Sequence, residues 1–380
     1  MAADRFKALL IDDELPMLKA LARAIPRLQP DWDIFTAQNA VQAIDLMQKH
    51  QPHLVLSDYR MPDMQGDALL LEAQKYCPLA LRTLLTGDSS EQVIITGYSA
   101  VHRYLAKPFS DQQLLAELEC VKHLSELPFN VDCRHQLGKL CSLPMLPRIY
   151  KELQQKMQAE DSDAKLIAKL IEQEPVLSAK IMQIANSAFL GFPRPTTSLP
   201  EAVNRLGSKL IQTICLATYS HGQLQQQLQP HEHQLLVQQG YQHAQLTRQL
   251  ARLLQFSREQ QDSLYMAALL SSLGKLIIAS LGCPLRQVQS RDELQTGYCD
   301  FGVITAYLLT LWGFPKEFGY ILMMQGKWRD DTKYNRASNI LFVAAQVLYE
   351  KQLPFLQHQP DVTLCNQPLS SLLEQLAAMH

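Results

Sequence analysis

The sequence has little net charge and lacks long apolar runs. Its 380 residues include 35 Lys and Arg against 37 Asp and Glu, which gives a formal net charge of -2. No strongly basic surface is therefore expected to attract nucleic acid. No stretch approaches the ~20 consecutive apolar residues of a membrane-spanning helix, and the first residues lack the apolar core of a signal peptide. We therefore expect neither nucleic acid nor a membrane as a partner.

Paired cysteines are also missing. The eight cysteines are scattered through apolar segments, and none has a partner at the spacing of a metal-binding motif. Unpaired cysteines of this kind are typical of proteins in a reducing compartment. The cysteine pattern therefore predicts a cytoplasmic protein.

The length exceeds what one ordinary core accommodates, and the pattern changes once along the chain. Residues 1–124 alternate short apolar runs with helical segments, and residues 137–340 show helical periodicity almost throughout. We therefore predict an N-terminal domain over residues 1–124, a linker over 125–136, a helical domain over 137–340 and further C-terminal helices over 341–380.

The N-terminal part contains five short apolar runs that predict strands. These runs are Ala8–Ile11, Ile34–Ala37, Leu54–Ser57, Leu81–Leu85 and Tyr104–Ala106. Because helical segments separate them, the pattern indicates an α/β domain with a doubly wound, five-stranded parallel sheet. Ser110 and Gln113 have the spacing of a capping box, so a helix is expected to begin just after Ser110.

The C-terminal part is predicted to be all-α. Several of its helices are expected to open with a proline at an early position, namely Pro147, Pro175 and Pro200. The glutamine-rich stretch Gln223–Gln239 is interpreted as a polar loop that runs into a helix. The last helices are expected at Asn339–Tyr349 and Ser370–Met379.

Chemically informative residues follow the predicted strands. Asp12 and Asp13 follow the first strand, Asp58 the third, Thr86 the fourth and Lys107 the fifth. In a doubly wound sheet these carboxyl ends meet at one edge. Three converging carboxylates suit a hard cation such as Mg²⁺, and a metal-supported aspartate can attack phosphorus. Lys107 and Thr86 would then hold the added phosphoryl oxygens.

At these residues the chain resembles the receiver domain of two-component response regulators, over roughly residues 5–124. The resemblance rests on five separated elements: the Asp12-Asp13 pair, the run Leu54–Pro62, Gly66, Thr86-Gly87, and Tyr104 three residues before Lys107-Pro108-Phe109.

The resemblance implies a phosphorylation site and its metal. Asp58 would accept the phosphoryl group from a cognate histidine kinase. The Mg²⁺ ion would be bound by Asp12, Asp13, Asp58 and the backbone carbonyl of Arg60.

The resemblance also implies a switch. Thr86 and Tyr104 would be the switch pair, and Lys107 would bind the phosphoryl group. Thr86 would move toward that group, Tyr104 would rotate into the space left behind, and the peptide bond before Pro108 would be cis.

Over roughly residues 135–335 the chain resembles the HDOD domain, an output module related to HD-type metal-dependent phosphohydrolases. The strongest match lies within Leu170–Pro195, which contains Glu174-Pro175 and Ile184-Ala185-Asn186-Ser187-Ala188-Phe189; further matches are Leu199–Gly207, Ala268–Lys275 and Trp312–Pro315.

The metal ligands of an HD-type hydrolase are largely missing from this match. Such hydrolysis needs His and Asp side chains around one or two metals. Ser271 and Ser272 stand where the His-Asp pair would fall, and Phe301 and Gln325 stand at later ligand positions. Only His243 fits a ligand position, so we expect a non-catalytic domain that binds an unknown downstream protein.

Two other functions stay open at this point. One is a response regulator with an HD-type phosphodiesterase output, since a shifted register would bring His221 or Asp300 into play. The other is a DNA-binding regulator, against which the acidic balance argues. A metal site at His231 and His233 with His243 is not expected, because no acid or thiolate accompanies them at a known spacing.

Overall fold

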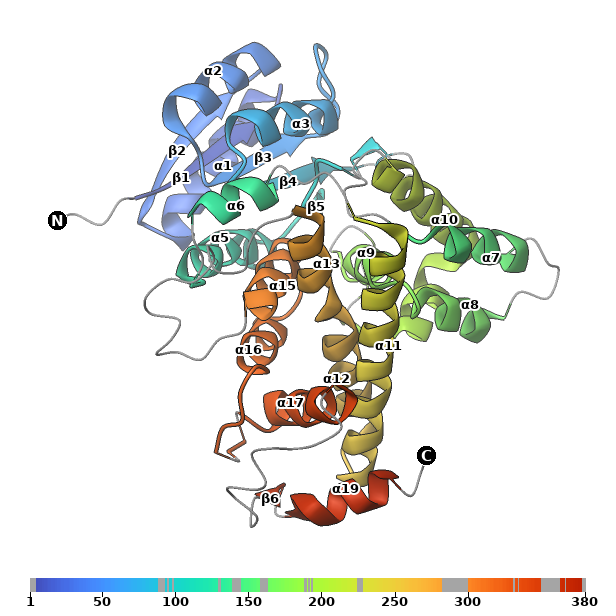
Figure 1. Cartoon of the computed structure of the whole chain (residues 1–380). Helices are drawn as coiled ribbons and strands as arrows, with labels where there is room; N and C mark the ends of the chain where they lie inside the picture. Colours follow the sequence, from blue (N-terminus) through green and yellow to red (C-terminus); the bar gives the residue numbers. More distant parts are fainter. Residues whose placement is uncertain are drawn as a thin grey trace.

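The N-terminal part of the chain is a parallel sheet with helices on both faces (Figure 1). In the computed structural model the strand order is β2-β1-β3-β4-β5. The elements are β1 (Phe6–Ile11), α1 (Leu15–Leu28), β2 (Trp32–Ala37), α2 (Ala40–His50), β3 (Leu54–Asp58), α3 (Gly66–Tyr76), β4 (Leu81–Thr86), β5 (Arg103–Ala106) and α5 (Asp111–Glu126). All five predicted strands are confirmed, and with them the doubly wound α/β fold.

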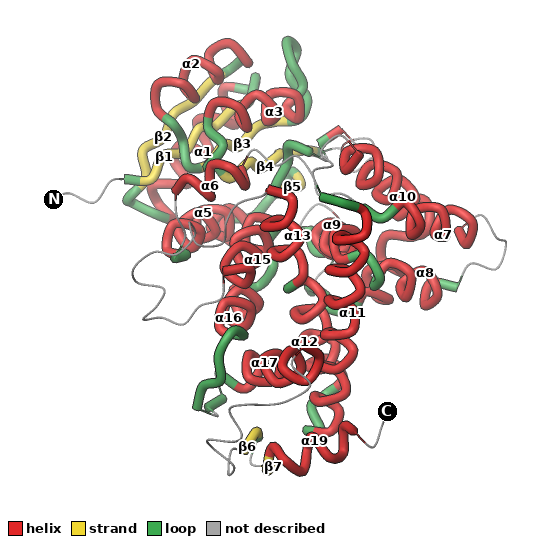
Figure 2. The backbone as a smooth tube through the Cα atoms, viewed as in Figure 1, coloured by secondary structure: helices red, strands yellow, loops and turns green. Residues whose placement is uncertain are grey.

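The structure describes residues 5–87, 93, 96–97, 99–128, 131–138, 145–157, 163–187, 190, 192, 194–223, 228–281, 300–330, 332–333, 335–349, 363–365 and 367–377. Within these residues, strands are confined to the N-terminal sheet and one small pair near the C-terminus (Figure 2).

The central strands are apolar because both of their faces are covered. Every residue of β3 and of β4 is buried, as expected of inner strands in a parallel sheet with helices on both faces. The register aligns the strand ends: Ile11 pairs with Ser57, Asp58 with Leu85, and Thr86 with Ala106. The residues that follow β1, β3, β4 and β5 therefore lie along one edge.

The capping box at the start of α5 is confirmed. The Ser110 Oγ accepts a hydrogen bond from the Gln113 backbone N–H at 3.3 Å, and the Gln113 Oε1 accepts one from the Ser110 N–H at 2.8 Å. These two bonds satisfy backbone donors that have no partner within the helix. They place the start of α5 directly after the Lys107–Pro108 turn.

The remainder is mostly helical, as predicted. Its elements are α6 (Val131–Gly138), α7 (Pro147–Met157), α8 (Ala164–Ile171), α9 (Pro175–Ala185), α10 (Leu199–Gln223, kinked at Gly207), α11 (Pro230–Leu253), α12 (Arg258–Leu270), α13 (Ser272–Leu281), α15 (Asp300–Leu311), α16 (Lys316–Met324), α17 (Arg336–Tyr349) and α19 (Leu369–Ala377).

Several sequence-based details of this part are confirmed. Pro147 and Pro175 open α7 and α9, and Pro200 is the second residue of α10. Of the glutamine-rich stretch, residues 230–239 belong to α11, and residues 224–227, where the polar loop was expected, lie outside the described residues. The segment 125–136, expected to be a linker, contains the end of α5 and part of α6. One feature was not predicted: Thr363–Leu364 and Gln367–Pro368 form a short antiparallel pair, β6 and β7.

One expectation about long apolar segments was wrong. Arg258–Ser280, which spans α12 and most of α13, is 23 residues long and apolar enough to cross a membrane by length and composition. However, 72% of its most apolar window is buried inside the protein. These helices pack against α9, α11, α15 and α16, so a place in the helical core accounts for their apolar composition.

The sheet and the helical part meet along β5 and α5 (Figure 1). Helix α5 packs on α15, and the Cys120 Sγ lies 3.3 Å from the Thr310 carbonyl oxygen. Next to β5, the Gln183 Nε2 of α9 donates a hydrogen bond to the His102 carbonyl at 2.6 Å. The strand that carries Tyr104 is therefore in direct contact with the helical part.

A buried charge network connects this contact to the sheet. Glu117 of α5 is 3% exposed. Its carboxylate accepts a hydrogen bond from the Thr83 Oγ1 at 2.7 Å and pairs with the Arg103 Nε at 2.8 Å. The Arg103 guanidinium in turn lies against Gly313, where an added Cβ would come within 3.2 Å of its Nη1. Gly313 has φ +79, a conformation that favours glycine.

We predict that Gly313→Ala weakens the contact between the two parts. The added methyl group would meet Arg103 and would force a left-handed backbone on alanine, a cost of about 1–2 kcal/mol. Urea unfolding of the full chain should show this loss. Gly319→Ala on α16 is the matched control, because the atom nearest its Cβ would be the Ala306 Cβ, at an ordinary 3.5 Å. Equal stability of the two variants would contradict the prediction.

Candidate functional site

The predicted acidic site is assembled at the carboxyl edge of the sheet. Asp12, which directly follows β1, is 1% exposed, and Asp58, which ends β3, is 8% exposed. The parallel pairing of β1 with β3 places the two strand ends side by side. Burial of two neighbouring carboxylates demands compensating charge or hydrogen bonds.

Lys107 supplies that charge. Its Nζ lies 2.7 Å from the Asp12 Oδ2 and 2.5 Å from the Asp58 Oδ1. Backbone donors take the other oxygens: the Asp12 Oδ1 accepts from the Glu14 N–H at 2.8 Å, and the Asp58 Oδ2 accepts from the Arg60 N–H at 3.0 Å. Each buried carboxylate thus has one partner from the backbone and shares one ammonium group.

The pKa values follow from this arrangement. Burial raises the pKa of Asp58, which Lys107 only partly offsets. Burial lowers the pKa of Lys107, but its bonds to Asp12 and Asp58 outweigh that effect and raise it overall. The ammonium is therefore charged at neutral pH, and a further cation would stabilise the ionised form of Asp58.

The donor set fits Mg²⁺ in its chemistry. The implied ligands, Asp12, Asp13, Asp58 and the Arg60 carbonyl, are all oxygen donors, which a hard cation prefers. Among the described residues no three His, Cys, Asp or Glu side chains are already grouped as metal ligands. Asp13 is exposed, and Lys107 bridges Asp12 and Asp58.

The remaining predicted residues lie on β4, on β5 and in the turn after it. Thr86 ends β4 and is 2% exposed. Tyr104 is 6% exposed, and its hydroxyl would be 2.9 Å from a Cβ built on Gly97. The Lys107–Pro108 peptide bond is cis, as the resemblance implied. Tyr104 is therefore a buried side chain on β5, close to Gly97.

Gly66 is required by close packing at the start of α3. A Cβ at this position would lie 2.0 Å from the Asp58 carbonyl oxygen. The Gly66 N–H also donates to the Tyr59 carbonyl at 2.9 Å, which folds the loop back over the end of β3. The sequence showed this glycine as part of the motif, and the structure gives its physical reason.

Comparison with known families agrees with this geometry. The model of the response regulator receiver domain matches residues 8–119, and the model of the HDOD domain matches residues 143–325. The chemotaxis protein CheY homologue of Campylobacter jejuni is 32% identical over 119 residues, which are 30% of this chain and 91% of that protein. The chain belongs to the response regulators.

Other relatives share only parts of this response regulator. The hydrogenase transcriptional regulatory protein HoxA of Bradyrhizobium diazoefficiens is 31% identical over 121 residues, which are 31% of this chain and 24% of HoxA. The MmoQ response regulator of Methylococcus capsulatus is 22% identical with a TM-score of 0.47, covering 61% of this chain and 98% of that one. The receiver domain of a Pseudomonas fluorescens HD domain-containing protein is 31% identical with a TM-score of 0.30, covering 31% and 95%.

In the HDOD part of the response regulator, hydroxyl groups lie at the positions of the expected His-Asp pair. Ser271 and Ser272 are each 1% exposed. Their Oγ atoms donate to the carbonyls of Ala268 and Leu269 at 2.7 Å, one turn back. The neighbouring helix approaches closely, because a Cβ on Gly240 would lie 2.6 Å from the Ser272 Cβ. Both hydroxyls thus point at backbone rather than into an open cavity.

The other residues considered as metal ligands either bond neighbouring groups or lie at separate places in the structure. The Gln325 Nε2 donates to the Leu322 carbonyl at 3.0 Å. His233 is buried near Glu174, and His231 is exposed. The side chains of His221 and Asp300 lie outside the described residues, as do Ala188 and Phe189 of the HDOD match.

His243 has a structural partner. It is 2% exposed, and its Nε2 lies 2.8 Å from the Leu341 carbonyl oxygen of α17. Burial lowers its pKa to about 4 from an ordinary 6.5. The neutral imidazole is therefore the form that links α11 to α17 at physiological pH.

We predict that His243 makes stability depend on pH. Its folded pKa lies below its unfolded pKa, so its contribution is complete above pH 6.5 and is lost as pH falls toward about 4. This contribution to the free energy of unfolding is about 3 kcal/mol. Urea unfolding at several pH values should show a steeper loss for the wild type than for His243→Gln. His231→Ala should keep the wild-type slope, and equal slopes for the wild type and His243→Gln would contradict the prediction.

Proposed function

We propose that this response regulator accepts a phosphoryl group on Asp58 from a cognate histidine kinase in the cytoplasm. In this proposal residues 1–124 are the domain that is phosphorylated, and residues 125–136 link it to the output domain. The output domain consists of residues 137–340 with the helices of 341–380, is non-catalytic and binds a partner protein. The observation that carries it is the Lys107 ammonium, which lies between the buried carboxylates of Asp12 and Asp58.

The chemistry follows from this placement. The Asp58 Oδ1 attacks phosphorus, the bond from phosphorus to the donor's imidazole nitrogen breaks, and the imidazole leaves with the electron pair. Lys107 then exchanges its contact with that carboxylate for a phosphoryl oxygen, and the Thr86 hydroxyl donates to another. Mg²⁺ held by Asp12, Asp13, Asp58 and the Arg60 carbonyl would neutralise charge on the transferred group.

Transmission to the output would use β5. Movement of Thr86 or Lys107 displaces the end of the strand pair β4 and β5, which are bonded through Thr86 and Ala106. His102 and Arg103, at the other end of β5, contact Gln183 and Gly313 of the helical part. A change in β5 therefore alters the docking of α9 and of the turn before α16.

We predict that a small phosphodonor with Mg²⁺ labels Asp58. Asp58→Ala should abolish the label, because Asp58 is the carboxylate that faces both Asp12 and Lys107. Asp63→Ala is the control, since Asp63 is an exposed acid in the adjoining loop. Intact-mass and peptide analysis report the outcome, and a label that persists in Asp58→Ala would refute the assignment.

The output is proposed to be non-catalytic because the hydroxyls of Ser271 and Ser272 donate to backbone carbonyls of α12, and neither offers a strong metal ligand. We predict that the purified full chain hydrolyses neither cyclic dinucleotides nor phosphomonoesters, and that its helical part holds no stoichiometric iron, manganese or zinc. Metal analysis by mass spectrometry checks this. Bound metal with a hydrolytic activity, both lost in His243→Ala, would replace the proposal with a phosphodiesterase output.

A further inference from the structure

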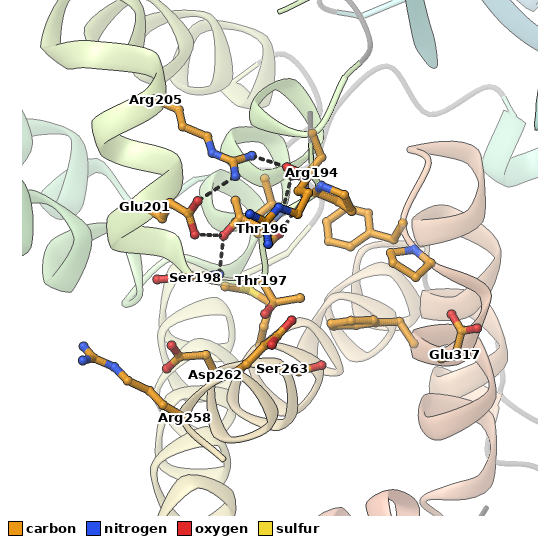
Figure 3. Close-up of a pocket in the computed structure, with 18 of the residues that line it drawn as sticks. Arg194, Thr196, Thr197, Ser198, Glu201, Arg205, Arg258, Asp262, Ser263 and Glu317 are labelled. Carbon is orange, nitrogen blue, oxygen red and sulfur yellow. Dashed lines mark hydrogen bonds and ion pairs between the residues drawn. The ribbon is translucent and has the colours of Figure 1, made fainter. Parts of the chain in front are cut away.

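The helical part contains a cleft of about 920 Å³ (Figure 3). Its walls are the end of α9, the segment 194–198, the start of α10, the start of α12, and the turn into α16. A second cleft of about 380 Å³ shares Thr197, Ser198, Arg258, Asp262 and Met266 with it. The two therefore form one elongated depression.

The floor of the larger cleft is apolar and firmly packed. Met182 and Met266 are each 1% exposed, and Phe318 is 4% exposed. Phe314 and Ile321, which are partly exposed, continue this surface along the turn and α16. A ligand would thus meet the partly exposed Phe314, an aromatic side chain of the type enriched in protein interfaces, over a firmly packed floor.

Part of the charge in the cleft is already used within the protein. The Arg205 Nη2 pairs with the Glu201 Oε1 at 2.6 Å, and the Thr196 Oγ1 donates to the Glu201 Oε2 at 2.7 Å. Asp262 pairs with Arg248 at 3.1 Å. These bonds hold the walls of the cleft in place. The charged side chains that could contact a ligand are therefore those at the rim.

The rim carries charges of both signs, with Arg258 and Glu259 side by side on α12 and Glu317 across from them on α16. Arg258 and Glu259 at the start of α12 and Glu317 at the start of α16 are exposed and form no ion pair with any described residue. Figure 3 shows Arg258 and Glu317 at opposite sides of the cleft, with Asp262 and Ser263 between them.

This balance of charge favours one class of ligand. Three arginines and four acidic residues line the cleft, so it lacks the positive excess that a nucleotide or another polyanion requires. A deeply buried apolar centre within a rim of mixed charge is the usual anatomy of a protein interface.

We propose that the cleft binds an extended peptide segment of a partner protein, in which an apolar side chain stands between an acidic and a basic residue. The apolar side chain would pack on Phe314 and Ile321. The acidic residue would face Arg258, and the basic residue would face Glu317. This inference rests on the proposed protein-binding output and names its partner's recognition element.

The same walls hold the receiver part. Met182 lines the cleft, and the next residue of α9, Gln183, bonds the His102 carbonyl. Phe314 lines the cleft, and the residue before it, Gly313, lies against Arg103. A peptide in the cleft and the receiver on the other side therefore contact one shared structure, which couples peptide affinity to the docking of β5.

The test uses the unphosphorylated full chain and a displayed library of random 12-residue peptides. We expect enrichment of peptides that contain an acidic, an apolar and a basic residue in the same order along the peptide. Fluorescence anisotropy then measures the affinity of a synthetic consensus peptide for the full chain. The swap Arg258→Glu with Glu317→Lys should weaken that peptide at least about tenfold and favour the reversed order. Both positions are exposed, so the melting temperature should stay at the wild-type value.

The matched control is Arg252→Glu with Glu374→Lys, a swap of exposed charges outside the cleft, which should bind like the wild type. The proposal is overturned if no peptide is enriched, or if the consensus peptide binds the two swapped variants equally. It is also overturned if a second copy of the chain, or ATP, displaces the bound consensus peptide. Hydrolysis of phosphoesters by a chain that still binds the peptide would refute only the non-catalytic output.

Discussion

The contact between the Lys107 ammonium and the carboxylates of Asp12 and Asp58 is the constraint on which the N-terminal part depends. Two carboxylates at neighbouring strand ends would repel each other in a buried setting. One cation on the last strand's turn compensates both, so the ends of β1, β3 and β5 are held together by charge as well as by the sheet. A group that displaces Lys107 from Asp58 must therefore supply compensating positive charge of its own.

From this edge the structure leads to the helical part through β5. Lys107 follows the carboxyl end of that strand, while Arg103 and His102 lie at its other end, against Gly313 and Gln183. The buried Glu117 connects Arg103 to Thr83 of the neighbouring strand. A polar network with this little solvent is rigid, since each member would be costly to leave without a partner. The contacts of β5 with the helical part are therefore held in a fixed geometry.

Polar residues of the helical part are bonded internally in one region and exposed to solvent in another. Near α13 the hydroxyls of Ser271 and Ser272 bond backbone carbonyls, and Gly240 lets α11 approach within contact distance of Ser272. Around the cleft, by contrast, charged residues remain exposed at the rim above buried methionines and Phe318. The two serine hydroxyls are thus engaged with backbone carbonyls, and the depression lies beside the segments that contact the receiver part.

The sequence by itself determined the doubly wound sheet, its five strands, the helical nature of the rest and the identity of the acidic edge. These features follow from local hydrophobic periodicity and from the residues at strand ends, and both can be recognised from short stretches of consecutive residues. It did not reveal the short β6 and β7 pair, the burial of the apolar α12 and α13 segment, or the partners of His243 and Glu117. Only the tertiary structure decided these, because Leu341 and Arg103 come from distant segments. The cleft likewise exists only where α9, α10, α12 and α16 converge, and no local pattern records that convergence.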